Sequence, residues 1–311
     1  MDYKNKKIIL PGGAGLVGQN LVNLLVENGF KNIVVIDKND KNLRLLQKRH
    51  PNLHCYLFDL SKKGAWKSFF KDAKIVVMLQ AQIGGKNLSE FIDNNVRSTK
   101  NIIEVMKFYK SGRLIHISSS VINSIAKDFY SNTKREQEKI VVKEFKKNVI
   151  LRPTLMFGKY ENKHLGWLFK FMKITPIFPI PGDGKFKRQP LYVKDFCKII
   201  LACIYNEKIK GIYNISGLEF ISYIEIINQI RDTTNTKVFI LKIPFRLFKS
   251  LLYIWQAFDK DPPFTVQQLE ALVADDKFDI IDWPKIFNIK ATLFRAAILE
   301  TFSNPNYSFH G

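Results

Sequence analysis

Cysteine is scarce in this chain of 311 residues, which has three cysteines and no CxxC pair. Without an even set of cysteines there is no sign of a disulfide framework, so we expect a reduced, intracellular protein. The five histidines stand singly, without the spacing of a metal-ligand cluster. No stretch approaches the roughly 18 apolar residues that cross a bilayer. These absences disfavour disulfide-rich, zinc-binding and membrane-spanning classes, and we expect a cytoplasmic location.

Acidic residues are also few, with 28 against 49 basic residues and a formal net charge of +21. Such an excess suggests an anionic partner: nucleic acid, a membrane surface or a phosphorylated small molecule. Arginine is better suited than lysine to bidentate recognition of phosphates and bases, and only 10 of the basic residues are arginine. The lysines are spread along the whole chain without a basic tail. We therefore favour a solvated lysine-rich surface and do not expect nucleic-acid binding.

The first half alternates short apolar runs with amphipathic stretches. The runs predict strands at residues 7–10, 32–37, 53–58, 75–79, 113–118 and 148–152. The amphipathic stretches predict helices at residues 16–28, 87–108 and 128–145. Repeated strand–helix–strand order predicts an α/β fold with a doubly wound parallel sheet, covered by helices on both faces.

The alternation of strands and helices changes after Pro153, where prolines divide the chain into shorter elements. We expect residues 1–153 to form the sheet domain and residues 154–311 to form mainly a smaller C-terminal α/β lobe. Residues 185–215 are expected to return to the sheet.

The stretch PGGAGLVG lies between the first predicted strand and the first predicted helix. Gly12 permits a tight turn, Gly15 lets backbone N–H groups approach a pyrophosphate, and Gly18 lets the helix pack close to the sheet. Leu16 and Val17 begin a helix whose N-terminus presents the positive end of its dipole to the phosphates. The pattern predicts a dinucleotide-binding site.

Acidic residues after two later strands fit the same ligand. Asp37 lies nineteen residues after Gly18, where a carboxylate can accept hydrogen bonds from the adenosine ribose diol. A 2′-phosphate would be repelled there, so the sequence favours NAD over NADP, although the neighbouring Lys38 leaves NADP open. Asp59 and Leu60 follow the third strand and are the expected contacts of the adenine.

Tyr130 and Lys134 are four residues apart, so on a helix they share a face. A phenol with a pKa of about 10 is a poor base at neutral pH, but a nearby ammonium stabilises the phenolate. Tyr130 could then move a hydroxyl proton while hydride passes to or from a nicotinamide. Upstream, a predicted strand ends in three serines, which could orient a substrate oxygen. His116 inside that strand is expected to be a satisfied core residue.

Together these segments resemble the extended short-chain dehydrogenases/reductases of the NAD-dependent epimerase/dehydratase family. The similar segments, besides Asp37 and Asp59-Leu60, are GGAGLVG (12–18), VVMLQAQ (76–82), NNVRSTKN (94–101), HISSSVIN (116–123), YSNTK (130–134), LRPTLMFG (151–158) and GDGKFKRQPLYVKD (182–195). The resemblance implies a Rossmann domain that binds NAD(P), a C-terminal lobe that holds a nucleotide-sugar substrate, and a homodimer.

The resemblance also implies residue roles. Ser119 matches the catalytic Ser/Thr, with Ser120 as the alternative and as a substrate contact. Tyr130 matches the general acid/base, and Lys134 matches the residue that tunes it and binds the nicotinamide ribose. Arg188 matches the arginine that binds the substrate diphosphate, for which its planar fork is suited. Further cofactor contacts implied are Leu79, Gln80, Ala81, Asn95 and Pro153, and the further substrate contact is Gln189.

Two departures from the family pattern narrow the function. Ser119 and Tyr130 are only eleven residues apart, which together with Gln189-Pro190 resembles the atypical branch that includes the 39-kDa accessory subunit of respiratory complex I. The 4,6-dehydratases have an acidic pair after the catalytic Thr, where this chain has Ser120 and Val121. Because dehydration needs an acid and a base, we disfavour a 4,6-dehydratase.

The sequence thus predicts an NAD-dependent epimerase or ketoreductase of a nucleotide-activated sugar. The alternative is a non-catalytic NAD(P)-binding accessory protein of the complex I type. Residues 242–258, KIPFRLFKSLLYIWQAF, mix apolar side chains with Arg246 and Lys249 and could rest on an anionic membrane. A packed helix or a dimer face explains the same pattern, and we favour it. With membrane contact, a reductase of a lipid-linked sugar at the inner face of a membrane becomes a further alternative.

Overall fold

The computed structural model describes residues 3–124, 128–146, 148–161, 163–258, 266, 269–270 and 280–303. The chain divides into two compact units. The first comprises Met1–Thr154, Val193–Ile215 and Asp279–Lys290, and the second comprises Leu155–Tyr192, Ser216–Phe278 and Ala291–Gly311. The segment that returns to the first unit therefore begins at Val193, and a second short segment joins the same unit later in the chain.

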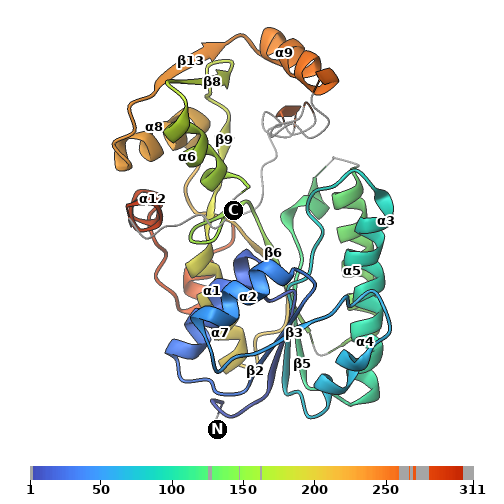
Figure 1. Cartoon of the computed structure of the whole chain (residues 1–311). Helices are drawn as coiled ribbons and strands as arrows, with labels where there is room; N and C mark the ends of the chain where they lie inside the picture. Colours follow the sequence, from blue (N-terminus) through green and yellow to red (C-terminus); the bar gives the residue numbers. More distant parts are fainter. Residues whose placement is uncertain are drawn as a thin grey trace. The chain divides into compact units, whose positions relative to one another are not determined.

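The first unit is built on a parallel sheet (Figure 1). Among the described residues it has seven strands in the order β11-β6-β5-β4-β1-β2-β3, and every neighbouring pair is parallel. Their bounds are β1 Ile8–Pro11, β2 Ile33–Asp37, β3 His54–Leu57, β4 Ile75–Met78, β5 Arg113–Ile117, β6 Asn148–Pro153 and β11 Gly211–Ile215. The expected α/β fold is confirmed, and the first six strands lie within one residue of the predicted bounds at each end.

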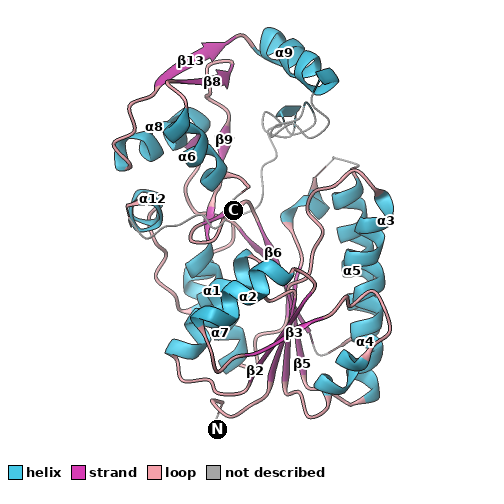
Figure 2. Ribbon diagram, in the orientation of Figure 1, coloured by secondary structure: helices cyan, strands magenta, loops and turns pink. Residues whose placement is uncertain are grey.

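Helices cover both faces of this sheet (Figure 2). One face carries α1 (Leu16–Glu27), α2 (Asp40–Arg49) and α7 (Val193–Tyr205), and the other carries α4 (Ser98–Phe108) and α5 (Phe129–Glu144). Because both faces are buried, the strands β1 and β4 near the centre of the sheet are continuously apolar. On the α4 and α5 side, the core contains Val76, Met78, Leu114 and Ile150 from the strands and Met106 and Val141 from the helices.

The helix predicted for residues 87–108 is confirmed as one helical run over residues 88–108, but it contains a π-helical segment that the sequence did not indicate. The structure divides it into α3 (Leu88–Phe91), the π-helical segment η2 (Ile92–Arg97) and α4. The Ser98 hydroxyl donates to the Asn94 carbonyl at 2.6 Å, and the Thr99 hydroxyl donates to the Asn95 carbonyl at 2.7 Å. These hydroxyls compete with backbone N–H groups for the carbonyls, which accounts for the local widening of the helix.

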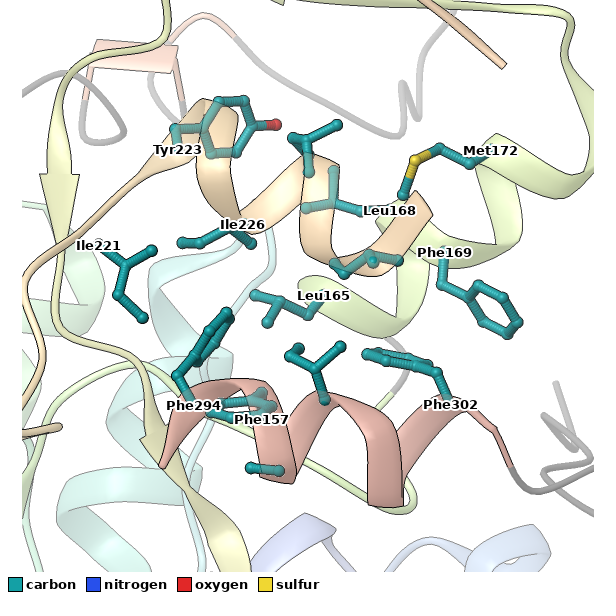
Figure 3. Close-up of a cluster of buried hydrophobic side chains, with 14 of the residues drawn as sticks. Phe157, Leu165, Leu168, Phe169, Met172, Ile221, Tyr223, Ile226, Phe294 and Phe302 are labelled. Carbon is teal, nitrogen blue, oxygen red and sulfur yellow. The ribbon is translucent and has the colours of Figure 1, made fainter. Parts of the chain in front are cut away.

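The second unit has its own apolar core, formed mainly by α6 (Leu165–Ile174), α8 (Tyr223–Thr233) and α12 (Phe294–Phe302). Figure 3 shows Leu165, Ile226 and Phe294 pointing into this core from the three helices. Ser222 and Glu225 form a capping box that starts α8. Two-stranded sheets complete the unit: β7 (Met156–Phe157) with β10 (Leu191–Tyr192), β9 (Lys187–Arg188) with β12 (Ile221–Ser222), and β8 (Ile177–Pro181) with β13 (Phe239–Ile243).

The apolar stretch near residue 250 forms α9 (Phe245–Phe258) in the second unit. Within this helix only Leu252 is fully buried, against Val266 and Leu269, while Phe245 and Phe248 pack partly on the same cluster. The favoured packed-helix interpretation therefore accounts for one face of α9. The rest of its apolar side chains are exposed. Nowhere in the described residues is a helix both long and apolar enough to cross a bilayer.

Candidate active site

The glycine turn connects β1 to α1 at the point where the strand order reverses between β1 and β4. Gly12 has a φ of +75°, and a Cβ there would lie 2.4 Å from the backbone nitrogen of Gln80. A Cβ on Gly18 would lie 2.2 Å from the Gly13 carbonyl oxygen, so helix and turn are in direct backbone contact. At Gly15, by contrast, the nearest atom is 3.5 Å away, and no side chain caps α1 there. Leu16 and Val17 therefore start a helix whose N-terminus suits a pyrophosphate.

Asp37 is the last residue of β2 and is hydrogen-bonded to this turn. Its carboxylate accepts the N–H groups of Ala14 and Asn39, each at 2.9 Å. Burial raises the pKa of Asp37, and these hydrogen bonds and the Lys38 ammonium oppose the rise. The carboxylate is thus held where the predicted ribose diol would lie, next to the uncapped helix.

Asp59 and Leu60 follow β3, as predicted. The Asp59 carboxylate accepts the Ser61 N–H at 2.9 Å and the Ser61 hydroxyl at 2.7 Å. Burial alone would raise the pKa of Asp59, but the Ser61 hydrogen bonds and the charges of Lys38 and Lys62 lower it overall. The carbonyl of the buried Leu60 accepts the Asn101 amide at 2.9 Å, so this segment is fixed to α4.

The segment after β4 lies against the glycine turn. The Leu79 N–H donates to the Pro11 carbonyl at 2.9 Å, and Gln80 faces Gly12. The Gln80 amide donates to Thr99 at 3.2 Å, while its buried Oε1 has no hydrogen-bond partner among the described residues. Ala81 is exposed. Pro153 ends β6, paired in register with Ile215.

Ser119 and Tyr130 meet between the end of β5 and the start of α5. The Ser119 hydroxyl lies close enough to the Tyr130 phenol to favour its phenolate form. Burial raises the pKa of Tyr130, the Ser119 hydroxyl opposes this rise, and the Asp128 carboxylate adds to it. Asp128 caps α5 by accepting the Ser131 N–H at 2.6 Å. Ser120, also buried, begins the short 3-10 helix η3 (Ser120–Asn123).

Lys134 lies one turn further along α5 and is completely buried. Its ammonium donates to the Ile117 carbonyl at 3.0 Å and to the Gln137 side-chain oxygen. Burial lowers the pKa of Lys134 to about 7, and the Glu138 carboxylate opposes this shift. Within the described residues no hydrogen bond joins Lys134 to Tyr130. The structure thus brings Ser119 and Tyr130 close together and holds Lys134 beneath the end of β5.

Asn95 connects the loop after β4 to the helix that carries Tyr130. Its side-chain oxygen accepts the Gln82 N–H at 2.7 Å, and its amide donates to the Gln82 carbonyl at 3.2 Å and to the Thr133 hydroxyl at 3.0 Å. Thr133 precedes Lys134 in α5. Asn95 therefore has a structural role that fixes α5 relative to the cofactor side of the sheet.

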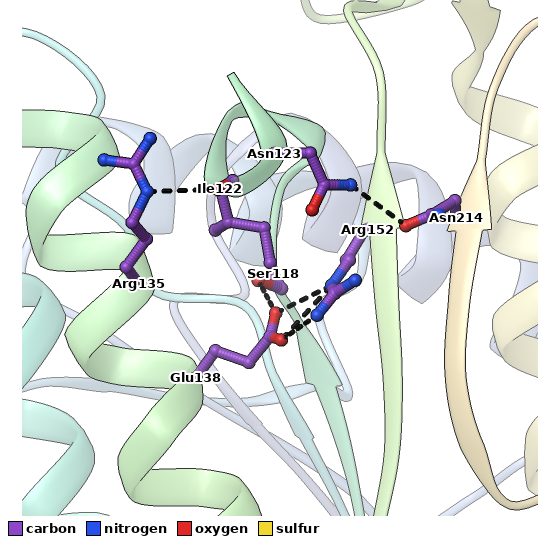
Figure 4. A network of polar contacts seen from close by, with 7 residues as sticks. All are labelled: Ser118, Ile122, Asn123, Arg135, Glu138, Arg152 and Asn214. Carbon is purple, nitrogen blue, oxygen red and sulfur yellow. Dashed lines mark hydrogen bonds and ion pairs between the residues drawn. The ribbon is translucent and has the colours of Figure 1, made fainter. Parts of the chain in front are cut away.

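A buried ion pair next to the site was not anticipated (Figure 4). Glu138 on α5 accepts the Ser118 hydroxyl at 2.5 Å and forms charged hydrogen bonds with the Arg152 guanidinium on β6. The sequence did indicate that Glu138 lies one helical turn after Lys134, and so on the same face of the helix. His116 is buried as expected, but the expectation that it is satisfied is wrong, because neither ring nitrogen has a hydrogen-bond partner in the part of the chain that the structure describes.

Arg188 and Gln189 belong to the second unit. Arg188 lies on β9 with its guanidinium 5.5 Å from the centre of the Phe186 ring, and it donates to the Lys187 carbonyl at 3.0 Å. The Gln189 amide donates to the Gly217 carbonyl at 3.4 Å. The guanidinium is thus stacked on an aromatic ring, which orients its planar fork.

Parts of the chain are similar in sequence to known proteins. A dTDP-D-glucose 4,6-dehydratase of Dictyostelium discoideum is 26% identical over 273 residues, or 74% of this chain and 62% of the dehydratase, so the chain spans less than two thirds of that relative's length. The mitochondrial NADH dehydrogenase (ubiquinone) 1 alpha subcomplex subunit 9 of the same organism is 24% identical over 268 residues, which cover 83% of this chain and 73% of the subunit.

Solved structures share the fold. The Bordetella bronchiseptica enzyme WbmF, solved in complex with NAD+ and UDP, has a TM-score of 0.76 and 18% identity to this chain, covering 97% of this chain and 92% of WbmF. The model of the NAD dependent epimerase/dehydratase family matches residues 8–216, more than half of the chain. The chain therefore belongs to the NAD-dependent epimerase/dehydratase family.

Proposed function

We propose that this protein is an NAD-dependent epimerase or ketoreductase that acts on a hydroxyl-bearing carbon of a nucleotide-activated sugar. The observation that carries the proposal is the proximity of the Ser119 hydroxyl to the Tyr130 phenol at the carboxyl end of β5. The same unit supplies an α1 without a side-chain cap, an uncrowded Gly15 and the Asp37 carboxylate, which fit the pyrophosphate and ribose of NAD.

Tyr130 is suited to hold and transfer the proton of the reacting hydroxyl. When bound, NAD supplies a nicotinamide ring that accepts or returns a hydride. With its pKa raised by burial, Tyr130 is a protonated phenol at neutral pH that can donate to a sugar oxygen. Removal of a proton from the sugar requires the phenolate, which the Ser119 hydroxyl and a charged Lys134 both favour. Ser119 can also donate a hydrogen bond to the substrate oxygen and hold it near Tyr130.

The nucleotide-sugar part of the proposal is supported by Arg188. A guanidinium can form two parallel hydrogen bonds with a diphosphate, and its stacking on Phe186 limits its orientations. The family resemblance and the presence of UDP in the WbmF structure support the same substrate class. Ser120 and Val121 offer no carboxyl group, which supports hydride transfer without elimination of water.

Tyr130→Phe tests catalysis directly. We expect purified wild-type protein to turn over at least one member of a panel of UDP-, GDP- and dTDP-sugars that raises its melting temperature. Tyr130→Phe should keep NAD binding and lose turnover by a factor of about 10² or more. A product lighter by one water would contradict the proposed reaction. Unchanged cellular function in Tyr130→Phe, with loss in a variant that cannot bind NAD, would instead support the accessory-protein alternative.

A further inference from the structure

Lys38 is a cation placed directly after the carboxylate expected to bind the adenosine ribose. An ammonium at this position could neutralise a phosphate on the ribose 2′-oxygen, which would favour NADP. In the structure, however, Lys38 Nζ donates a hydrogen bond to Asn94 Oδ1 at 2.8 Å. The bond links the end of β2 to the π-helical segment η2, which are separated by 56 positions in the sequence.

Asn94 is oriented by its other hydrogen bonds. Its Nδ2 donates to Gln82 Oε1 at 2.9 Å, and Gln82 Nε2 in turn donates to the Gly84 carbonyl. Because a backbone carbonyl can only accept, this chain of bonds determines which atom of each amide points in which direction. The acceptor Oδ1 of the buried Asn94 must therefore face Lys38.

Two carboxylates also act on the same ammonium through their charge. Lys38 interacts electrostatically with Asp37 beside it and with Asp59 after β3. Lys38 is thus held by an amide oxygen and lies in a negative environment. Both features oppose its reorientation toward a phosphate, and the second also repels a 2′-phosphate directly.

We propose that Asn94 is a specificity-determining residue for the cofactor: by holding Lys38 Nζ, it keeps this ammonium from a ribose 2′-phosphate and so favours NAD over NADP. Asp37 then faces the ribose diol without competition from the neighbouring lysine. The inference rests on dinucleotide binding at the glycine turn, which is part of the proposed function.

The test measures dissociation constants of NAD+ and NADP+ by titration calorimetry for the wild type, Asn94→Ala, Lys38→Ala and the double variant. In Asn94→Ala, the released Lys38 should improve NADP+ affinity relative to NAD+ by about threefold to tenfold. In the double variant the ratio should return to within about twofold of the wild-type value, because the gain depends on Lys38. A gain that persists without Lys38, or no gain, would overturn the proposal.

Two further variants keep the test decisive if Asn94→Ala does not fold. Lys38 is exposed, so Lys38→Ala should fold, and because its ammonium is already engaged the NADP+/NAD+ ratio should change by less than about twofold. A large loss of NADP+ affinity in Lys38→Ala would show that Lys38 already binds the phosphate and would sink the proposal. Asn94→Asp should weaken NADP+ further, since a carboxylate holds Lys38 more strongly. Absence of NAD+ binding in the wild type would refute the proposed function itself, a distinguishable result.

Discussion

The Ser119 hydroxyl, after the end of β5, lies close enough to the Tyr130 phenol, in the first turn of α5, to favour its phenolate form. Ser119 is therefore expected to be the catalytic serine, and Ser120 a neighbour without that interaction. Ser119→Ala should lower kcat by about 10- to 100-fold, because one hydrogen bond to the reacting oxygen is lost. Ser120→Ala is the matched control and should change kcat by less than about threefold. Initial rates with the activating sugar would decide, and a larger loss in Ser120→Ala would reverse the assignment.

Local chemistry explains why the glycine turn and the parallel sheet could be predicted. A strand that turns sharply into a helix needs a residue at positive φ, and Gly12 supplies it at +75°. Asp37 could be assigned because its distance from Gly18 follows from the length of one helix and one strand. In each case the determining interactions lie within a few turns of the chain.

Long-range pairing explains what could not be predicted. The ion pair between Glu138 and Arg152 depends on how α5 lies across β6, which no local pattern shows. The contact between Lys38 and Asn94 likewise joins segments that are far apart in the sequence. The π-helical segment within the helix of residues 88–108 depends on hydroxyl–carbonyl bonds made by Ser98 and Thr99, which hydrophobic periodicity does not detect.

Gly15→Ala and Gly18→Ala are expected to impair different properties of the protein, namely NAD binding and folding stability. Gly15 has a φ of −77° and ordinary space around its missing Cβ, so Gly15→Ala should fold with a melting temperature within a few degrees of the wild type. Its methyl group would nevertheless occupy the path of the pyrophosphate and weaken NAD binding by about tenfold or more. Gly18→Ala should instead lower the melting temperature strongly, since its Cβ would clash with the Gly13 carbonyl. Equal effects of both variants on stability would contradict this distinction.

Lys134 should make stability depend on pH. Burial lowers its pKa to about 7 in the folded state, against about 10.4 in the unfolded chain. Between these values the unfolded chain binds the proton and the folded one does not, so the free energy of unfolding rises with pH. The contribution is fully present above the unfolded pKa and is lost as the pH falls through about 7. Denaturant titrations at pH 7 and pH 9.5 should show wild type gaining stability relative to Lys134→Met.

The control for this titration is Lys100→Met, at an exposed lysine on α4. Relative to the wild type, this variant should show nearly the same difference in unfolding free energy at both pH values. A difference between the wild type and Lys134→Met that stays constant with pH would mean that Lys134 keeps its proton when buried.

The pair of Glu138 and Arg152 should behave as one unit in stability measurements. The side chains are 7% and 19% exposed, so removing one partner leaves a largely buried charge without its counter-ion. Glu138→Gln and Arg152→Met should each lower the free energy of unfolding by about 3–5 kcal/mol. The double variant should recover part of this loss, because neither charge then remains unpaired. Urea denaturation measures all three, and losses that simply add in the double variant would argue against coupling.

The exposed face of α9 is expected to bind anionic membranes weakly. Leu247, Leu251, Ile254 and Phe258 recur at helical spacing and are 53%, 48%, 58% and 87% exposed, and the charged residues of the helix are Arg246 and Lys249. Such a helix can insert its apolar face at the headgroup boundary while basic residues face anionic lipids. The protein should therefore co-sediment with phosphatidylglycerol vesicles and less with phosphatidylcholine vesicles. Ile254→Glu should reduce this binding, whereas Val142→Glu, at a similarly exposed apolar residue on α5, should not. Equal sedimentation of both variants, or no sedimentation of the wild type at moderate salt, would contradict membrane binding. The exposed face of α9 would then be explained as an interface between copies of the chain. The oligomeric state of Ile254→Glu in solution would test that explanation.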